Sequence, residues 1–207
     1  MIKSFLAIFS LFLITSCGTK AIENTPENEI KRFQQELNAG YLNEKETPLR
    51  GENYVKFKQH PFFPIDLKYR VKAKLVKTEN SKPFEIPTSS GKTKTYREYA
   101  KAHFSIDGKP QTLTIYQNLA NLSSEQYKDY LFLPFRDVTN GKDTYGGGKY
   151  IDLRIPEGDE IIIDFNKSYH PYCAYNAYDY ICPIVPEENN LPIEIRAGVM
   201  YEDIWFE

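Results

Sequence analysis

The sequence has few of the residues on which metal and thiol chemistry depend. Its 207 residues include three histidines, His60, His103 and His170, and three cysteines. His170 and Cys173 are close in sequence, but no further ligand cluster accompanies them, and no histidine is evidently paired with a thiol. There is also no block of basic residues and no nucleic-acid-reading motif. We therefore expect no metal, no cofactor and no nucleic-acid partner.

Apart from the amino terminus, no apolar run is long enough to cross a membrane. A lysine at position 3 and an apolar run from Phe5 to Ile14 have the order of an export signal. The following residues, Ile14-Thr15-Ser16-Cys17, resemble a lipobox. This resemblance implies cleavage after Ser16 and a lipid anchor on Cys17, so we expect a bacterial lipoprotein held on a membrane of the cell envelope, outside the cytoplasm. The alternative is an ordinary secretory signal that contains a cysteine.

Removing residues 1–16 leaves 207 − 16 = 191 residues, a length that suits one domain with a sizeable core. Residues 17–24 are polar and predict a short tether. Thr25 as the N-cap and Pro26 at the first helical position predict a helix over residues 25–41, with Gly40 as its stop. The apolar face of this helix consists of Ile30, Phe33, Leu37 and Tyr41. Residues 45–207 are expected to form a single β-rich domain.

Several short segments of this domain have the patterns of β-strands. Apolar and basic residues alternate over residues 67–75, and Asp107-Gly108 lies between two alternating runs, which is typical of a hairpin. The triple isoleucine 161–163 predicts a fully buried strand, and further short strands fit residues 130–135, 149–153 and 193–197. Many short strands separated by proline and glycine predict an all-β, mainly antiparallel fold, either a β-sandwich or a partly closed barrel with an N-terminal helix.

Consecutive motifs in the second half of the chain resemble one bacterial family. They are FRDVTNG at 135–141, TYGGGKYID at 144–152, DFNKSYHPYCAY at 164–175, and CP to NNLP over 182–192. On these motifs, roughly residues 45 to 200 resemble the uncharacterised family known as domain of unknown function 1684. The chain departs from the family pattern at Lys149, Ser168, His170, Asn190 and Val199, where the family has Arg, Ala, Asn, Arg and Glu. The family has no established activity, so the resemblance implies a fold and not a function.

Two parts of this region are candidates for a ligand-binding site. Tyr145, Gly146 and Gly147 form a glycine-rich segment before Lys149, which suits an anionic group held by backbone N–H donors and one positive charge. The alternative is a tight turn that feeds the strand at 149–153. A second segment combines aromatic faces and amides that suit stacking on a sugar or another flat ligand, namely Asn166, Tyr169, Tyr172 and Asn176. The alternative is a loop that covers a sheet edge.

Carboxylates and cysteines in the same region allow other chemistry. Asp137 and Asp164 are candidate catalytic carboxylates that could act as an acid and a base, and Asp152 is a further polar candidate. The alternative is that Asp137 and Asp164 only cap local turns. Once Cys17 is lipidated, Cys173 and Cys182 can form a disulfide or remain as two thiols.

Three functions follow from these patterns. The leading hypothesis is a membrane-anchored module of the cell envelope that binds a small molecule, such as a sugar-like ligand. The second is an envelope hydrolase that uses Asp137 and Asp164. The third is a structural or assembly lipoprotein without a small-molecule site. The sequence does not indicate an oligomeric state.

Overall fold

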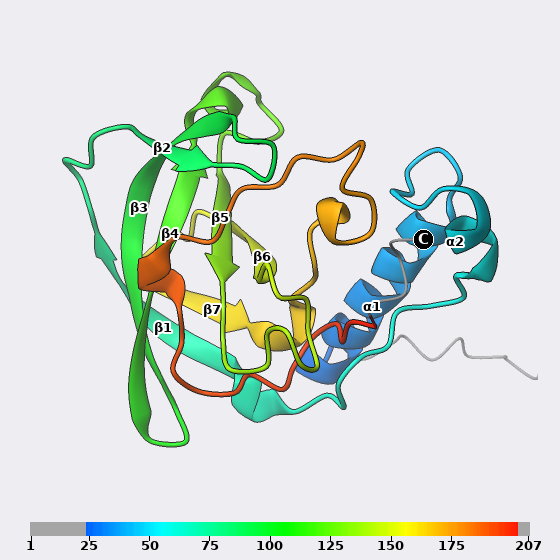
Figure 1. Cartoon of the computed structure of the whole chain (residues 1–207). Helices are drawn as coiled ribbons and strands as arrows, with labels where there is room; N and C mark the ends of the chain where they lie inside the picture. The colour runs from blue at the N-terminus through cyan, green and yellow to red at the C-terminus, as the bar shows by residue number, and fades with distance from the viewer. Residues whose placement is uncertain (1–23, 203–207) are drawn as a thin grey trace, which may run out of the picture.

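The computed structural model describes residues 24–202, so the predicted export signal and the predicted lipid-anchor residue Cys17 lie outside the described residues. Seven strands form one antiparallel sheet that curls into a half-barrel (Figure 1). Along the sheet the order is β6-β5-β4-β3-β1-β7, with β2 added on β3. The strands are β1 (Arg70–Lys77), β2 (Phe84–Pro87), β3 (Thr93–Ile106), β4 (Lys109–Asn118), β5 (Tyr130–Phe135), β6 (Lys149–Arg154) and β7 (Glu160–Asp164). The fold therefore belongs to the expected class, a mainly antiparallel, partly closed barrel with an N-terminal helix.

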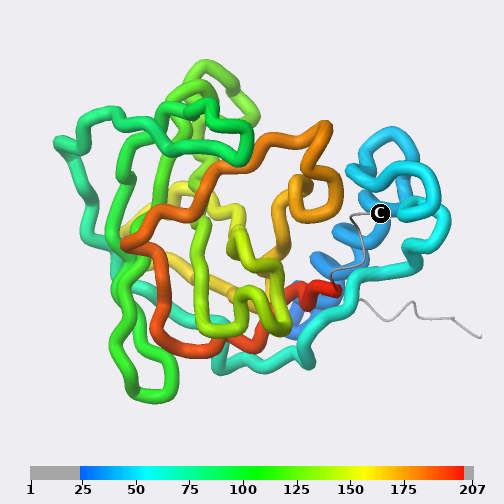
Figure 2. The backbone as a smooth tube through the Cα atoms, viewed as in Figure 1, coloured from blue at the N-terminus to red at the C-terminus, as the bar shows by residue number. Residues whose placement is uncertain are grey.

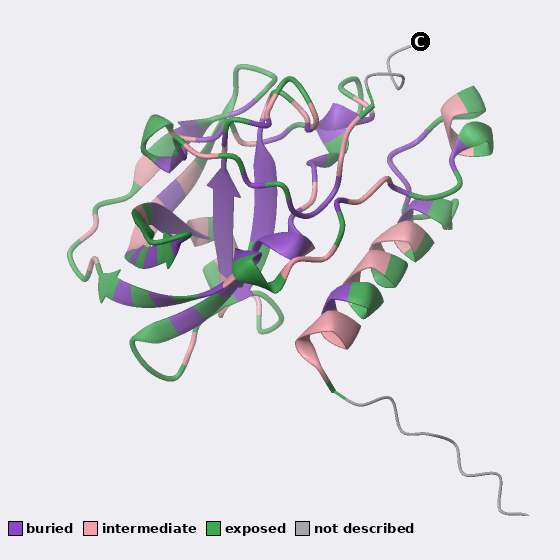
Figure 3. Cartoon of the chain, turned by 90° about the horizontal axis from the view of Figure 1, so that it is seen from below, coloured by how far each residue is buried: buried purple, intermediate pink, exposed green. Residues whose placement is uncertain are grey.

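Alternating side chains place the main core inside the curl of this sheet. On β1, Val71, Ala73 and Leu75 are buried, whereas the residues between them face outward. Figure 3 shows the same alternation as bands of buried and exposed residues along the strands. The core continues through Leu131 and Leu133 of β5. A second, smaller cluster lies on the other face, where Tyr150 packs among residues of β2, β3 and β5. The half-barrel thus buries apolar residues on both faces near β5 and β6.

The hairpin between β3 and β4 forms where the sequence predicts it. Asp107 and Gly108 have φ angles of 50° and 74°, the left-handed values that a two-residue hairpin turn requires at both central positions. The ladder on either side runs from Ile106 opposite Lys109 to Tyr96 opposite Asn118. Local turn chemistry therefore fixes the register of the two longest strands.

Helix α1 (Pro26–Leu42) lies beside the half-barrel, and the short helix α2 (Gly51–Lys56) follows it (Figures 1 and 2). The Thr25 hydroxyl accepts a hydrogen bond from the Asn28 N–H (3.3 Å), as expected for an N-cap. The helix continues past Gly40, and the N–H of Asn43 closes it on the Gly40 carbonyl. Arg70 of β1 ion-pairs with Glu29 of α1 (3.2 Å). The helix is thus attached next to β7, one of the two end strands of the sheet order.

Two of the expected strands differ from the prediction. The triple isoleucine forms β7, but Ile162 is 43% exposed because successive side chains of a strand point to opposite faces, and Ile162 points away from the main core that holds Ile161 and Ile163. Residues 193–197 form no strand. The Ile195 N–H donates to the Asp137 carboxylate (3.1 Å), and the Ile193 carbonyl accepts from Val138. These backbone groups bond to a loop instead of to a neighbouring strand, while Ile195 and Ala197 still fill the core.

Candidate ligand-binding site

Three cavities meet on β6 between the sheet, α1 and the chain after β7. The first, called here the tyrosine cavity, measures about 390 Å³ and is lined by Phe33, Leu37, Tyr150, Asp152, Tyr169, Pro171, Tyr172, Tyr180, Ile181, Cys182 and Pro183. A sheet-face cavity of about 430 Å³ adjoins it at Tyr150, Asp152, Tyr169 and Pro183. A seam cavity of about 410 Å³ lies between β6, β7 and α1 and shares Phe33 and Asp152 with the first. Asp152 is therefore common to all three cavities.

The position of Asp152 follows from the alternation of β6. Ile151 and Leu153 point into the main core, so Tyr150 and Asp152 point to the opposite face of the strand. The Tyr130 and Tyr169 hydroxyls both donate to Asp152 Oδ1, at 2.6 and 2.7 Å. Among the described residues, no donor is assigned to Oδ2. The carboxylate is thus fixed by two tyrosines and retains acceptor capacity at the meeting point of the cavities.

Five of the eleven described residues that line the tyrosine cavity are aromatic. Tyr150 and Tyr169 are packed edge to face, with an interplanar angle of 84°, and Tyr172 and Tyr180 repeat this arrangement at 84°. Burial raises the pKa of Tyr169 well above its usual value, and the nearby Asp152 carboxylate raises that pKa further. Burial also raises the pKa of Tyr150. These hydroxyls therefore remain protonated donors at neutral pH.

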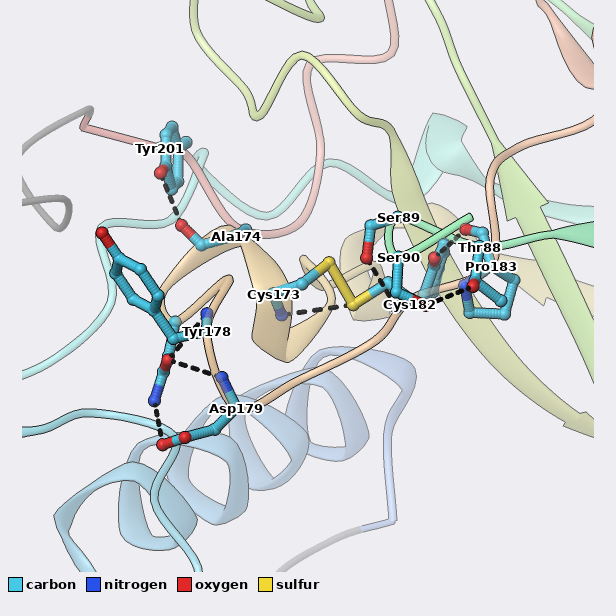
Figure 4. Close-up of a disulfide and its surroundings, with 12 residues drawn as sticks. Thr88, Ser89, Ser90, Cys173, Ala174, Tyr178, Asp179, Cys182, Pro183 and Tyr201 are labelled. Carbon is cyan, nitrogen blue, oxygen red and sulfur yellow. Dashed lines mark hydrogen bonds between the residues drawn. A yellow bond between two sulfur atoms is a disulfide. The ribbon is translucent and has the colours of Figure 1, made fainter. Parts of the chain in front are cut away.

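A disulfide holds the outer wall of this cavity in place. The structure joins Cys173 and Cys182, which is one of the two states that the sequence left open. The Ser89 hydroxyl accepts from the Cys182 N–H (3.2 Å), so the bridge is connected to the turn between β2 and β3 (Figure 4). Between the two cysteines, Tyr178 is 99% exposed at the tip of the loop, whereas Tyr180 turns back to line the cavity.

Lys149 and Asp137 form a buried ion pair instead of facing a ligand. The Lys149 Nζ lies 2.9 Å from Asp137 Oδ2, both side chains have no exposed surface, and Nζ also donates to the Ile195 carbonyl (2.8 Å). Asp137 Oδ1 accepts from the Thr139 and Ile195 N–H groups. Burial lowers the pKa of Lys149, although Asp137 opposes this effect. The pair closes one end of the core and directs no charge toward the glycine-rich segment.

The glycine-rich segment itself is a turn that leads into β6. Gly146 and Gly147 are turn residues and the strand begins at Lys149. A Cβ atom at Gly148, whose φ is +109°, would lie 2.9 Å from the Phe135 carbonyl oxygen, so glycine is needed there for close packing. Neither Tyr145 nor Gly146 nor Gly147 lines any of the three cavities. The structure thus has the turn that the sequence offered as the alternative to an anion-binding loop.

Asp164 and Asn166 belong to a separate network. Asp164 accepts from Arg70 (2.9 Å), which faces it across β1 and β7, and from the N–H and side-chain amide of Asn166. Asn166 also bonds to both backbone groups of Asp66. Asp137 and Asp164 are therefore held in two different ion pairs. The structure does not bring them together at one cavity, which removes the geometric basis of the proposed acid–base pair.

The remaining candidate residues are likewise divided between structural hydrogen bonds and the walls of the cavities. Asn176 donates to the Pro48 carbonyl (2.9 Å) and to Asp179, so its amide connects the disulfide loop to the segment between the helices. Of the eight ligand-binding candidates, only Tyr169 and Tyr172 line the three cavities. The sequence named Asp152 as a polar candidate without assigning it a role, and it missed Tyr150. The period-two pattern of residues 149–153 was the signal that places these two side chains on one face.

His170 and His60 lie in a buried hydrogen-bonded chain away from these cavities. The Tyr145 N–H donates to His170 Nε2 (3.4 Å), and the Tyr175 hydroxyl lies between His170 Nδ1 (3.2 Å) and His60 Nδ1 (3.4 Å). Burial lowers the pKa of His60 to about 3 and that of His170 well below its usual value. Both imidazoles are therefore neutral structural groups. Residues 24–202 contain no cluster of three His, Cys, Asp or Glu side chains arranged to hold a metal ion.

Fold and site together define a class of protein: a curled antiparallel half-barrel with aromatic-lined cavities on one face. The chain belongs to the family described as protein of unknown function (DUF1684), which matches residues 55–200. Among solved structures it is similar to the solution structure of an uncharacterized protein from gene locus rrnAC0354 of Haloarcula marismortui. The two chains are 31% identical with a TM-score of 0.66, over 84% of this chain and 94% of that one. No curated protein matches the chain. In the described part of the chain, no helix has the length and apolar character needed to cross a bilayer.

Proposed function

We propose that this protein binds a small organic ligand in the tyrosine cavity, with Asp152 as the central polar contact. The observation that carries the proposal is the position of Asp152 at the meeting point of three cavities, next to the edge-to-face pair of Tyr150 and Tyr169. Ligand sites are typically concave, about 300–1,000 Å³, largely apolar and equipped with a few placed polar groups. The tyrosine cavity, at about 390 Å³, has these properties.

Several features support a preformed site. The carboxylate of Asp152 is oriented by two hydroxyl donors before any ligand arrives. The Tyr150 hydroxyl donates to the Pro183 carbonyl, which fixes a ring that lines both the tyrosine cavity and the sheet-face cavity. A site whose side chains are already ordered loses less conformational entropy on binding, so more of the contact energy appears as affinity.

We further propose that the protein acts as a lipoprotein on a membrane of the cell envelope, through a lipid on Cys17. Eight residue steps separate Cys17 from Thr25, the N-cap of α1. A fully extended chain of this length spans at most about 28 Å, so the ligand site would operate close to the membrane surface. Expression in a bacterial host with a radiolabelled fatty acid tests the anchor. The wild type should carry the label, Cys17→Ser should not, and an unlabelled wild-type protein would contradict the proposal.

Ligand binding can be tested with a variant that fills the cavity. Leu37→Trp adds an indole to the wall contributed by α1, whereas Val55→Trp adds the same group at a site that is 71% exposed and outside the three cavities. A panel of sugars, amines and envelope metabolites is screened by thermal shift. A ligand present at 100 times its Kd stabilises the folded state by about 2.7 kcal/mol. Stabilisation should be lost in Leu37→Trp and kept in Val55→Trp. Equal stabilisation of both variants, or none of the wild type by any compound, would refute the proposal.

A further inference from the structure

The described wall of the tyrosine cavity contains a single charged side chain, and its charge is negative. Of the described residues that line it, Asp152 is the only Asp, Glu, Lys, Arg or His side chain. The others are five aromatic residues together with leucine, isoleucine, prolines and a bridged cysteine. The carboxylate therefore gives the cavity a formal charge of −1 at neutral pH, with no cation in its wall to neutralise it.

Basic residues of the neighbouring cavities are already paired or do not line the tyrosine cavity. Arg70, in the seam cavity, contacts both Glu29 and Asp164. Lys167, in the same cavity, lies 3.6 Å from Glu29. Lys94 lines the sheet-face cavity but not the tyrosine cavity. An anionic ligand in the tyrosine cavity would thus meet a carboxylate without a matching positive charge.

Ring geometry adds a second, independent feature. The two tyrosine pairs, Tyr150 with Tyr169 and Tyr172 with Tyr180, each place rings at 84° to one another. Two rings at right angles allow a ligand beside the pair to meet a ring face as well as a ring edge. Aromatic faces attract cations through their quadrupole, by about 0.5–2 kcal/mol for each contact, and such enclosures are used to hold quaternary ammonium groups.

From these two features we infer that the tyrosine cavity binds the cationic head of an alkylammonium compound, with the aromatic rings around the head and Asp152 as its counter-ion. The inference rests on the proposed ligand-binding function and specifies the class of ligand. A neutral molecule of the same shape would retain the apolar contacts, but it would lose both the attraction to Asp152 and the cation–π contacts.

The test compares charged probes with a neutral molecule of matched shape. Choline and 3,3-dimethylbutan-1-ol differ in that a carbon atom replaces the charged nitrogen, and ethanolamine provides a primary ammonium group. Isothermal titration with the wild-type protein at low ionic strength should give choline or ethanolamine an affinity at least about tenfold above that of the neutral alcohol. Asp152→Asn retains an acceptor for Tyr130 and Tyr169 but removes the charge, so it should reduce the preference for the cation to about threefold or less. Asp159→Asn makes the same change at an exposed position that lines none of the cavities, and it should leave the preference unchanged.

Each outcome decides the inference. Equal affinity for choline and the neutral alcohol would overturn the cationic ligand while leaving a ligand-binding function in place. The same holds if neither ammonium compound binds but a neutral compound of the panel stabilises the wild type and not Leu37→Trp. If no compound binds in the cavity, both the inference and the proposed function fail. A preference for the cation that persists in Asp152→Asn would refute the role of Asp152 as the counter-ion.

Discussion

The buried ion pair between Lys149 and Asp137 should control the stability of the fold. Lys149→Met removes the ammonium group and leaves the Asp137 carboxylate in a site without exposed surface. Removing one partner of a buried pair costs about 3–5 kcal/mol, a large share of the roughly 5–15 kcal/mol that typically separates a folded domain from its unfolded state. Urea unfolding followed by circular dichroism measures the loss directly.

A double-variant cycle separates the stranded charge from simple loss of packing. Asn at position 137 can still accept from Thr139 and Ile195 but carries no charge. The combined variant Asp137→Asn/Lys149→Met should therefore be more stable than Lys149→Met alone, by about 1 kcal/mol or more. A loss below about 1 kcal/mol for Lys149→Met, or a less stable combined variant, would refute this reasoning.

Three further changes test other parts of the structure. Burial lowers the pKa of His60 to about 3, against about 6.5 in an unfolded chain. The neutral imidazole of His60 therefore contributes fully to stability above pH ~6.5. This contribution is lost as the pH falls toward 3, by up to about 1.4 kcal/mol per pH unit. Urea midpoints between pH 7 and 5 should depend less on pH in His60→Gln than in the exposed-site control His103→Gln; the same slope in both would contradict this. Replacing Cys173 and Cys182 with serine removes the disulfide that closes a loop with a sequence separation of 9. This change should lower the free energy of unfolding by about 3 kcal/mol and should also weaken ligand binding. Unchanged stability and unchanged affinity would be the contrary result. Gly198→Ala puts a Cβ against the Ser168 side chain at a φ of +79° and should lower stability by at least about 2 kcal/mol, whereas Gly158→Ala, in open space, should be nearly neutral in the same assay; similar costs would argue against the packing explanation.

The sequence was most informative where local chemistry decides the structure. Asp107 and Gly108 determine their turn through their own backbone preferences, and the Thr25 cap with Pro26 marks the start of α1. Patterns that depend on a neighbour were less reliable. The run 161–163 is apolar throughout, but whether Ile162 is buried depends on what covers the face of the sheet opposite the main core. The motifs identified the family, and the alternating strands identified the fold class.

The site was predicted less well than the fold because its residues meet only in three dimensions. Asp152 is set by the alternation of β6, but its hydroxyl donors Tyr130 and Tyr169 come from β5 and from the chain beyond β7. Phe33 of α1 completes the wall from more than a hundred residues away. Conversely, Lys149 has the residue type of an anion-binding group, and only its burial beside Asp137 shows that it is structural. No spacing along the chain contains that information.

The attachment of α1 also has a consequence for how the molecule folds. The helix is synthesised before the sheet, yet Phe33 and Leu37 line the same cavity as Tyr150, Tyr169 and Tyr180, which are synthesised more than a hundred residues later. Most of the stability of a helix in a protein comes from the tertiary packing of its apolar face, and contacts between distant parts of a chain form slowly. We therefore expect α1 to dock after the sheet has formed and to detach before the sheet unfolds. Amide hydrogen exchange should then be faster in α1 than in β3 and β4, and every such opening would dismantle the tyrosine cavity while leaving the half-barrel intact.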